Sequence, residues 1–206
     1  MTNWLLYSIG FLAQLLFSSR LIIQWVLSEK KQSVVTPKLF WVLSLLASIL
    51  LFIYGYLRND FPIMLGQVLT YFIYIRNLQL QKEWQKLTAF FQVIIVIFPI
   101  GMITYMLINN NFDIKYLLLN KTVTNWLLLL GIFSQVIFTF RFIYQWLYSE
   151  KKKESKLPLG FWVLSLIGAI LILIYGFFRK DPVLIIAHLF GIIIYIRNIT
   201  LIKTVF

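Results

Sequence analysis

Residues 20–31 read RLIIQWVLSEKK, and residues 141–152 read RFIYQWLYSEKK. Both stretches belong to a longer internal repeat, in which residues 14–80 align without a gap on residues 135–201 and 30 of the 67 pairs are identical. A repeat of this kind is one structural unit used more than once, so it decides the architecture before any local motif does. We therefore expect two copies of one fold, offset by 121 residues.

The composition indicates a membrane protein. Of the 206 residues, 61% are hydrophobic and 13% are charged, and the mean hydropathy is +0.85. The apolar segments run for about 20 residues, enough to cross a hydrocarbon core of roughly 30 Å as helix, and none alternates with a period of two. Soluble enzymes and outer-membrane barrels are thereby excluded. With no cysteine and one histidine, disulfide frameworks, thiol chemistry and metal clusters are excluded too, and we expect no cofactor.

The hydropathy pattern predicts an all-α integral membrane protein with seven transmembrane helices. The predicted spans are 4–27, 38–58, 61–80, 88–108, 125–148, 159–179 and 182–203. The first span has no basic residue before it, is too long for a signal peptide and is followed by no small-residue cleavage site. We therefore expect the mature chain to keep it.

Each copy of the repeat holds three helices, an odd number, so joining the copies directly would invert the second one. The uncharged helix 88–108 adds the crossing that restores a parallel orientation. This 3+1+3 order divides the chain into a first repeat at 1–82, a linker helix and outer loop at 83–124, and a second repeat at 125–206. Parallel triplets related by an axis along the membrane normal are a known transporter plan, with the pathway between the repeats.

Basic residues predict the orientation. With the N-terminus outside, twelve Lys and Arg residues fall in cytoplasmic segments and five in outer loops. The positive-inside bias therefore predicts an outer N-terminus and a cytoplasmic C-terminus. The same surplus produces the net charge of +12, which we attribute to attraction for anionic lipid and not to nucleic-acid binding.

Two arginines, Arg20 and Arg141, lie inside predicted spans, each with a glutamine four residues later on the same helical face, Gln24 and Gln145. A charge in hydrocarbon is costly enough to indicate a role. The guanidinium group of arginine is planar and permanently charged, and its N–H groups can donate two parallel hydrogen bonds to a phosphate or a carboxylate. The alternative is structural: each arginine snorkels to the inner interface or bonds carbonyls of a neighbouring helix.

A polar stripe with i, i+3, i+7, i+10 spacing runs along the third helix of each copy. Its members are Gln67, Thr70, Tyr74 and Asn77, then His188, Gly191, Tyr195 and Asn198. Such a stripe must face protein or a water-filled cavity. His188 serves either as a hydrogen-bonded packing residue or as a proton relay. No acidic residue lies mid-span, which favours a facilitator or a site for an anionic head group over a proton- or sodium-coupled carrier.

Four tryptophans lie at the helix ends beside the basic loops: Trp25, Trp41, Trp146 and Trp162. They either anchor the helices at the lipid interface or offer a flat surface on which a sugar ring can stack.

Glutamates and arginines at the same helix ends predict structural ion pairs. We expect one salt bridge within each triplet, between Glu29 and Arg76 in the first copy and between Glu150 and Arg197 in the second. If these pairs do not form, Arg76 and Arg197 become candidates for binding lipid phosphate.

The string SRLIIQWVLSEKK at 19–31, followed by PKLFWVLSL, IYGYLRND and YIRNL, resembles the lipid A biosynthesis N-terminal domain family in both copies. The three-helix unit and the 3+1+3 order are also similar, in architecture alone, to the SWEET and PQ-loop transporters. The family resemblance implies a bacterial inner-membrane protein of glycolipid or lipopolysaccharide assembly. It does not imply catalysis, because the synthase after which the family is named needs a large soluble glycosyltransferase domain. The copies differ where Gly66-Gln67 becomes Ala187-His188 and where the loop becomes KKKESKLP.

The first functional hypothesis is a non-enzymatic carrier or flippase for a lipid-linked sugar or another phosphate-bearing glycolipid intermediate in lipid A or envelope glycan biosynthesis. One alternative is a non-catalytic anchor or accessory subunit for a separate glycosyltransferase partner. A second alternative, a small-sugar facilitator, leaves the embedded arginines unexplained. The predicted binding residues are Arg20, Gln24, Trp25, Trp41, Gln67, Tyr74, Arg76, Asn77, Arg141, Gln145, Trp146, Trp162, His188, Tyr195, Arg197 and Asn198.

Overall fold

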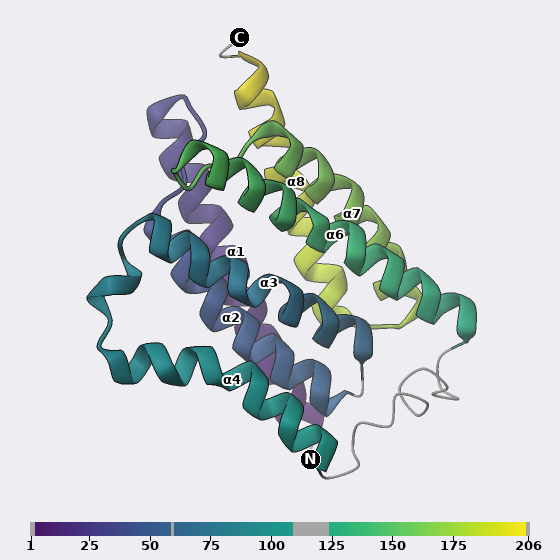
Figure 1. Cartoon of the computed structure of the whole chain (residues 1–206). Coiled ribbons are helices and arrows are strands. Elements are labelled where there is room, and N and C mark those ends of the chain that lie inside the picture. Colours follow the sequence, from purple (N-terminus) through teal and green to yellow (C-terminus); the bar gives the residue numbers. More distant parts are fainter. Residues whose placement is uncertain (1–2, 59, 109–123, 205–206) are drawn as a thin grey trace.

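The computed structural model of the chain describes residues 3–58, 60–108 and 124–204 (Figure 1). These residues form seven α-helices and one short 3₁₀ helix, and no strand, so the predicted all-α class is confirmed. The elements are α1 (Asn3–Lys31), α2 (Lys38–Leu57), α3 (Phe61–Leu80), η1 (Trp84–Lys86), α4 (Ala89–Ile108), α6 (Asn125–Lys152), α7 (Leu159–Phe178) and α8 (Pro182–Thr204). Apart from Thr124, the predicted outer loop 109–124 lies outside the described residues.

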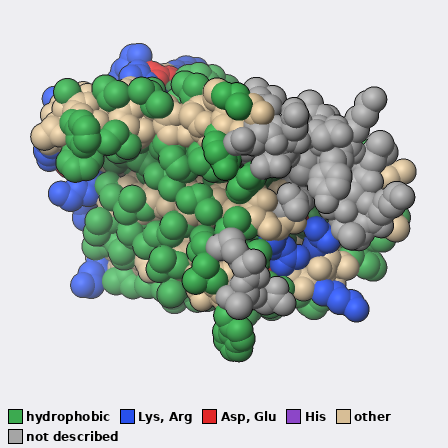
Figure 2. All heavy atoms as spheres, turned by 90° about the horizontal axis from the view of Figure 1, so that it is seen from below, with side chains coloured by type: hydrophobic (Ala, Val, Ile, Leu, Met, Phe, Trp, Pro, Cys, Tyr) green, Lys and Arg blue, Asp and Glu red, His purple; other side chains and the backbone are tan. Residues whose placement is uncertain are grey.

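Five helices are long and apolar enough to cross a membrane, namely α1, α2, α6, α7 and α8. The apolar part of α4, Ala89–Tyr105, is shorter, and the crossing of α3 and α4 stays a prediction. Figure 2 shows a face covered largely by hydrophobic side chains, with Lys and Arg at its margins. Trp4, Phe90 and Leu129 are among the large apolar side chains exposed over more than half of their surface. A surface of this kind suits hydrocarbon and not water.

Helices α1 and α6 extend one turn beyond their predicted ends at residues 27 and 148, to Lys31 and Lys152. The apolar pattern stops at the Ser-Glu-Lys-Lys sequence, but Glu and Lys are good helix formers and continue the helix. The serine of each sequence then ties down the following loop, because the Ser28 hydroxyl accepts the Val35 N–H at 3.0 Å and the Ser149 hydroxyl accepts the Lys156 N–H at 3.1 Å.

The two copies of the repeat pack as triplets in which the middle helix contacts both others, α2 with α1 and α3, and α7 with α6 and α8. Across the middle of the molecule, α3 packs on α6 and α8 packs on α1. Helix α4 packs on the first triplet. There, Phe98 packs against Phe52 and Tyr71, and the Tyr71 hydroxyl donates to the Ile95 carbonyl at 2.8 Å. The third helix of each triplet thus lies beside the first helix of the other.

The predicted salt bridges within each triplet are wrong, because both pairs form between the triplets. Arg197 donates to both Glu29 carboxylate oxygens, at 2.5 and 2.9 Å, and Arg76 likewise binds both oxygens of Glu150. The physical reason is the packing of α8 on α1 and of α3 on α6, which brings each arginine to the other copy's glutamate. Equivalent helix ends of both copies therefore meet at one end of the molecule, which we call the basic end.

Candidate functional site

A cavity lies between the two triplets, with walls from α1, α3, α6 and α8. Its empty space is about 690 Å³ when the volume open to the outside is included. Six of the predicted binding residues line it: Arg20, Gln67, Tyr74, Arg141, His188 and Tyr195. The packing of each third helix on the other copy's first helix brings these residues together.

Arg20 is buried in the wall of this cavity, with 3% of its surface exposed. Its Nη1 donates to the hydroxyl of Ser44, and its guanidinium carbon lies 4.5 Å from the ring centroid of Phe17 and 4.8 Å from that of Phe40. Its Nε is buried and has no hydrogen-bond partner. The side chain is held by a neutral hydroxyl and aromatic faces, which leaves its charge uncompensated.

Arg141 occupies the equivalent position in the second copy and is 2% exposed. Its Nη1 donates to the Tyr195 hydroxyl at 3.2 Å, and its guanidinium carbon lies 3.4 Å from the Phe138 ring centroid. Its Nε is also buried without a partner. Since neither arginine reaches the surface, the snorkelling alternative does not describe them.

The two guanidinium groups face a common ring. Their carbons lie 5.6 Å (Arg20) and 4.5 Å (Arg141) from the centroid of Phe142. Among the described residues, neither arginine forms a salt bridge with a carboxylate. An unpaired buried charge costs several kcal/mol, and cation–π contacts of about 1 to 2 kcal/mol offset only part of that cost. The cavity therefore presents two positive charges that an anion can neutralise.

Neutral polar groups complete the cavity wall. Thr70 donates to the Gly66 carbonyl at 2.9 Å, and Gln67 donates weakly to the Ile63 carbonyl at 3.4 Å, so both groups keep acceptors free. The His188 ring stands edge-on to Phe138, with ring centroids 5.0 Å apart. Such groups can accept and donate hydrogen bonds to hydroxyls of a bound molecule.

Four of the predicted site residues lie outside the cavity and form an amide layer between the copies. The Gln24 amide donates to Asn198 at 2.9 Å, and the Gln145 amide donates to Asn77 at 2.9 Å. All four side chains are fully buried. Their bonds join the first helix of one copy to the third helix of the other, between the cavity and the basic end.

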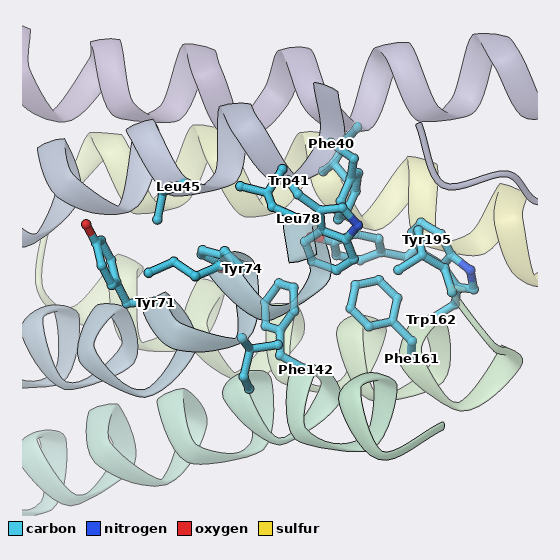
Figure 3. Close-up of a cluster of buried hydrophobic side chains, with 14 of the residues drawn as sticks. Phe40, Trp41, Leu45, Tyr71, Tyr74, Leu78, Phe142, Phe161, Trp162 and Tyr195 are labelled. Atoms are coloured by element: carbon cyan, nitrogen blue, oxygen red, sulfur yellow. The ribbon is translucent and has the colours of Figure 1, made fainter. Parts of the chain in front are cut away.

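An aromatic cluster with side chains from both copies shares Tyr74, Phe142 and Tyr195 with the cavity wall (Figure 3). Trp41 and Trp162 are fully buried in it, each edge-on to the preceding phenylalanine. Full burial is incompatible with an anchoring role at the lipid interface, and neither tryptophan lines the cavity. The other two predicted tryptophans, Trp25 and Trp146, donate their indole N–H groups to Glu29 and Glu150 and so support the ion pairs of the basic end.

The opposite end of the molecule holds two buried aspartates that sequence reasoning missed. Asp181 accepts the Tyr54 hydroxyl at 3.2 Å and pairs with Arg58 at 3.1 Å. In the same way Asp60 accepts the Tyr175 hydroxyl at 3.1 Å and pairs with Arg179 at 3.6 Å. Each aspartate therefore binds residues of the other copy.

The signal for this second set of contacts is the pattern YGxxRxD, which recurs at 54–60 and 175–181. Each aspartate also caps the helix that follows, since Asp60 accepts the Ile63 N–H and Asp181 accepts the Leu184 N–H, both at 3.2 Å. Burial raises the pKa of the Asp60 carboxyl above its ordinary value, and the nearby Arg179 opposes that rise. We call this region the aspartate end.

Contacts between the copies thus lie at both ends of the molecule, the basic end and the aspartate end. Within the described residues no cluster of His, Asp or Glu is able to hold a metal ion. What the arrangement can do chemically is bind an anion with two guanidinium groups and hydrogen-bond the neutral part of the same molecule.

The similarity to known proteins extends over both copies of the repeat. The profile described as "Lipid A Biosynthesis N-terminal domain" matches residues 9–79 and 130–200. Proteins named lipid-A-disaccharide synthase from Chlamydia pneumoniae, Chlamydia caviae and Chlamydia trachomatis serovar D are each 32% identical to the chain over 96% of its length. The alignments cover 33%, 33% and 34% of those proteins, so the chain spans about a third of the length of the relatives it matches. No solved structure is significantly similar to it.

Proposed function

Because the chain belongs to the Lipid A Biosynthesis N-terminal domain family, we propose that it carries a phosphate-bearing glycolipid intermediate of lipid A or envelope glycan biosynthesis across the bacterial inner membrane. In this proposal the cavity between the copies holds the head group. Arg20 and Arg141 bind the phosphate, and the polar groups of α3 and α8 surround the sugar.

The observation that carries the proposal is the pair of buried arginines without a carboxylate partner. Elsewhere in the described part of the chain, Arg58, Arg76, Arg179 and Arg197 all pair with carboxylates. Only the two arginines that line the cavity do not. The two unpaired charges lower the stability of the protein, whereas a carboxylate compensates every other described arginine. An anionic ligand bound to them would restore that stability.

The chemistry of the wall supports a head group that has both a charge and hydroxyls. A phosphate can take bidentate hydrogen bonds from guanidinium groups, and a sugar offers hydroxyls to Gln67, Tyr74 and His188. The name of the relatives, lipid-A-disaccharide synthase, also denotes work on a glycolipid. A free neutral sugar would leave both charges uncompensated, so the small-sugar facilitator explains less of the site.

The proposal includes the arrangement in the membrane. All seven helices cross in a 3+1+3 order with two parallel repeats, as in the SWEET plan, and α4 is the linker helix. The N-terminus lies outside and the basic end lies at the cytoplasmic face. The excess of Lys and Arg at that end supports this orientation.

A second candidate function is a non-catalytic anchor or accessory subunit that positions a glycosyltransferase at the cytoplasmic face. One observation favours it: the matched region makes up only a third of the synthases. In that case the cavity would hold an ordinary membrane phospholipid or serve only packing, and the arginines would tolerate any substituent that keeps the charge.

The test replaces the two arginines of the cavity by lysine, which removes the guanidinium groups and keeps the positive charges. Arg20→Lys and Arg141→Lys each lose one bidentate contact, and a charge-assisted hydrogen bond is worth about 1.5 to 3 kcal/mol, so each should weaken head-group binding by roughly tenfold to a hundredfold. The double variant should abolish glycolipid translocation in cells that lack the native protein. Arg179→Lys is the matched control, because Arg179 lies outside the cavity and pairs with Asp60. Full activity of the double variant at equal membrane abundance would refute the carrier and favour the anchor.

A further inference from the structure

The two seams between the copies are equivalent in the repeat but differ in the structure. We call the contact of α3 with α6 the α3–α6 seam and the contact of α8 with α1 the α1–α8 seam. Gly66 is buried in the α3–α6 seam, and a Cβ at this position would lie 1.8 Å from Nε2 of Gln135. The equivalent residue of the α1–α8 seam is Ala187, which has that Cβ and is partly exposed. In the α3–α6 seam the Gln135 side chain therefore occupies the space that the Cβ of Ala187 fills in the α1–α8 seam.

The amide layer has more hydrogen bonds in the α3–α6 seam than in the α1–α8 seam. In the α3–α6 seam, Asn77 and Gln145 exchange two hydrogen bonds, at 2.9 and 3.1 Å, and the Ser155 hydroxyl adds a third to Asn77 at 2.8 Å. In the α1–α8 seam, Gln24 donates one bond to Asn198, and the Gln24 carbonyl oxygen is buried without a partner. A buried acceptor without a partner is destabilising, so the α1–α8 seam is the less stable one.

The cavity wall is also more open beside the α1–α8 seam. Thr139, on the α3–α6 side, is 2% exposed, whereas the equivalent Ser18 of α1 is partly exposed. Both residues line the cavity. Next to Ser18 and Ala187 the surface is apolar, with Leu15 exposed over 63% and Ile186 over 58% of their surfaces. A lateral opening of the cavity on this side would therefore face hydrocarbon.

Access from either end of the molecule is harder. From the basic end a ligand has to break the ion pairs, the amide layer and the aromatic cluster. From the aspartate end it has to separate two buried ion pairs. Breaking a buried ion pair is strongly destabilising, whereas the α1–α8 seam has no ion pair at the level of the cavity among the described residues.

We infer that an anionic membrane lipid loads the cavity sideways through the α1–α8 seam while the α3–α6 seam stays closed. The phosphate reaches Arg20 and Arg141, and the acyl chains remain in the bilayer beside Leu15 and Ile186. This inference rests on the proposed function, since it assumes that the two arginines bind phosphate. It deepens that function by excluding a water-soluble sugar phosphate as the ligand, because such a molecule cannot cross the apolar mouth.

The test locks one seam at a time, and the chain suits it because it has no cysteine of its own. Gln14→Cys with Ala187→Cys bridges the α1–α8 seam, and Gly66→Cys with Gln135→Cys is the matched bridge of the α3–α6 seam. A short bifunctional thiol reagent closes each bridge, and the mass of the intact protein reports closure. The probe is phosphatidic acid in phosphatidylcholine nanodiscs, and native mass spectrometry measures the lipid retained by the cross-linked protein. The four single-cysteine variants control for the substitutions.

Locking the α1–α8 seam should lower the retained phosphatidic acid at least tenfold, and locking the α3–α6 seam should leave it unchanged. Equal retention in both locked proteins, or loss with the α3–α6 lock alone, would overturn the lateral route and leave the phosphate site standing. If the unlocked protein retains no more phosphatidic acid than its Arg20→Lys, Arg141→Lys variant, the proposed phosphate site is wrong, and the lateral route that depends on it is wrong too. Binding of inorganic phosphate from solution to the α1–α8-locked protein, measured by calorimetry, would reveal an aqueous route and also overturn the inference.

Discussion

Glu29 of α1 accepts two hydrogen bonds from Arg197 of α8, although the repeat offers an identical arginine, Arg76, within its own copy. The same crossing occurs in the amide layer and at the aspartate end, where Gln24 binds Asn198 and Asp181 binds Tyr54. Each of these motif residues therefore has its hydrogen-bond or ion-pair partner in a motif of the other copy. This explains why the identities between the copies concentrate in the motifs, since each crossed contact needs the same two residue types in both copies.

The crossed ion pair predicts which charge reversal is rescued. Glu29→Arg should lower the apparent melting temperature in detergent because it sets two cations side by side at the basic end. Adding Arg197→Glu should restore the wild-type value, since the pair then forms with reversed polarity. Adding Arg76→Glu, the partner within the same copy, should not restore it. Rescue by the Arg76 change instead would contradict the crossed arrangement.

Trp162 offers a stabilising substitution. The indole N–H of Trp41 donates to Ser155 at 2.8 Å, whereas that of Trp162 is buried without a partner. The repeat places Val34 where the second copy has Ser155. Val34→Ser should therefore supply the missing acceptor and raise the free energy of unfolding by about 0.5 to 1.5 kcal/mol.

The converse substitution is the control for Val34→Ser. Ser155→Val removes the acceptor of Trp41 and a donor to Asn77, so it should lower stability by about 1 to 3 kcal/mol. Thermal unfolding followed by tryptophan fluorescence measures both. A loss of stability in Val34→Ser would show that the loop cannot bring a hydroxyl to Trp162.

The aspartate end should be sensitive to a neutral replacement. Asp181→Asn keeps an oxygen for the helix cap but leaves the Arg58 charge without its partner, 3.1 Å away in the native protein. Since the Asp181 side chain is fully buried, the loss should be about 3 to 5 kcal/mol. Glu83→Gln, in the exposed pair with Lys86, is the matched control and should change the unfolding temperature little. Equal effects of the two variants would place the Asp181 pair in water.

A glycine of α7 is expected to limit the packing behind Arg141. A Cβ on Gly168 would lie 2.7 Å from the Cα of Phe138, the residue whose ring packs on Arg141. Because backbone cannot rotate away, Gly168→Ala should destabilise the protein by about 1 to 3 kcal/mol.

Gly101 of α4 provides the control, since a Cβ there meets nothing within 4 Å. Gly101→Ala should be neutral or stabilising by up to about 1 kcal/mol through helix propensity. Urea or thermal unfolding of both variants checks the contrast. Equal stability of the two would mean that α6 and α7 separate easily at this point.

The proposed orientation predicts a labelling pattern in intact spheroplasts. Cysteines replacing Lys31 and Lys152 should resist a membrane-impermeant thiol reagent, because both residues lie at the basic end. A cysteine replacing Lys180, which is exposed near the aspartate end, should react. Protection of Lys180→Cys with labelling of the other two would reverse the orientation, and labelling of one of Lys31→Cys and Lys152→Cys alone would contradict parallel repeats.

The helices, their order and the duplication follow from the sequence alone. Hydropathy and spacing are properties of one helix at a time, so runs such as 38–57 and 159–178 are recognisable without knowledge of their neighbours. The same local reasoning identifies Arg20 and Arg141, because a charge inside an apolar span stands out wherever the helix packs. It also identifies the polar stripe of α3, of which Gln67, Thr70, Tyr74 and Asn77 are all buried.

Only the tertiary structure decided which residues meet. Arg76 and Arg197 are equivalent in the repeat, so no pattern along the chain distinguishes them as partners for Glu29. The choice is made by the packing of α8 on α1, which depends on side-chain fit between helices more than 150 residues apart in sequence. The same packing places the arginines at the cavity and the glutamine–asparagine pairs outside it. It also decides what fills the space beside Gly66, because the Gln135 side chain of α6 occupies there the position of the methyl group that Ala187 has in the other copy.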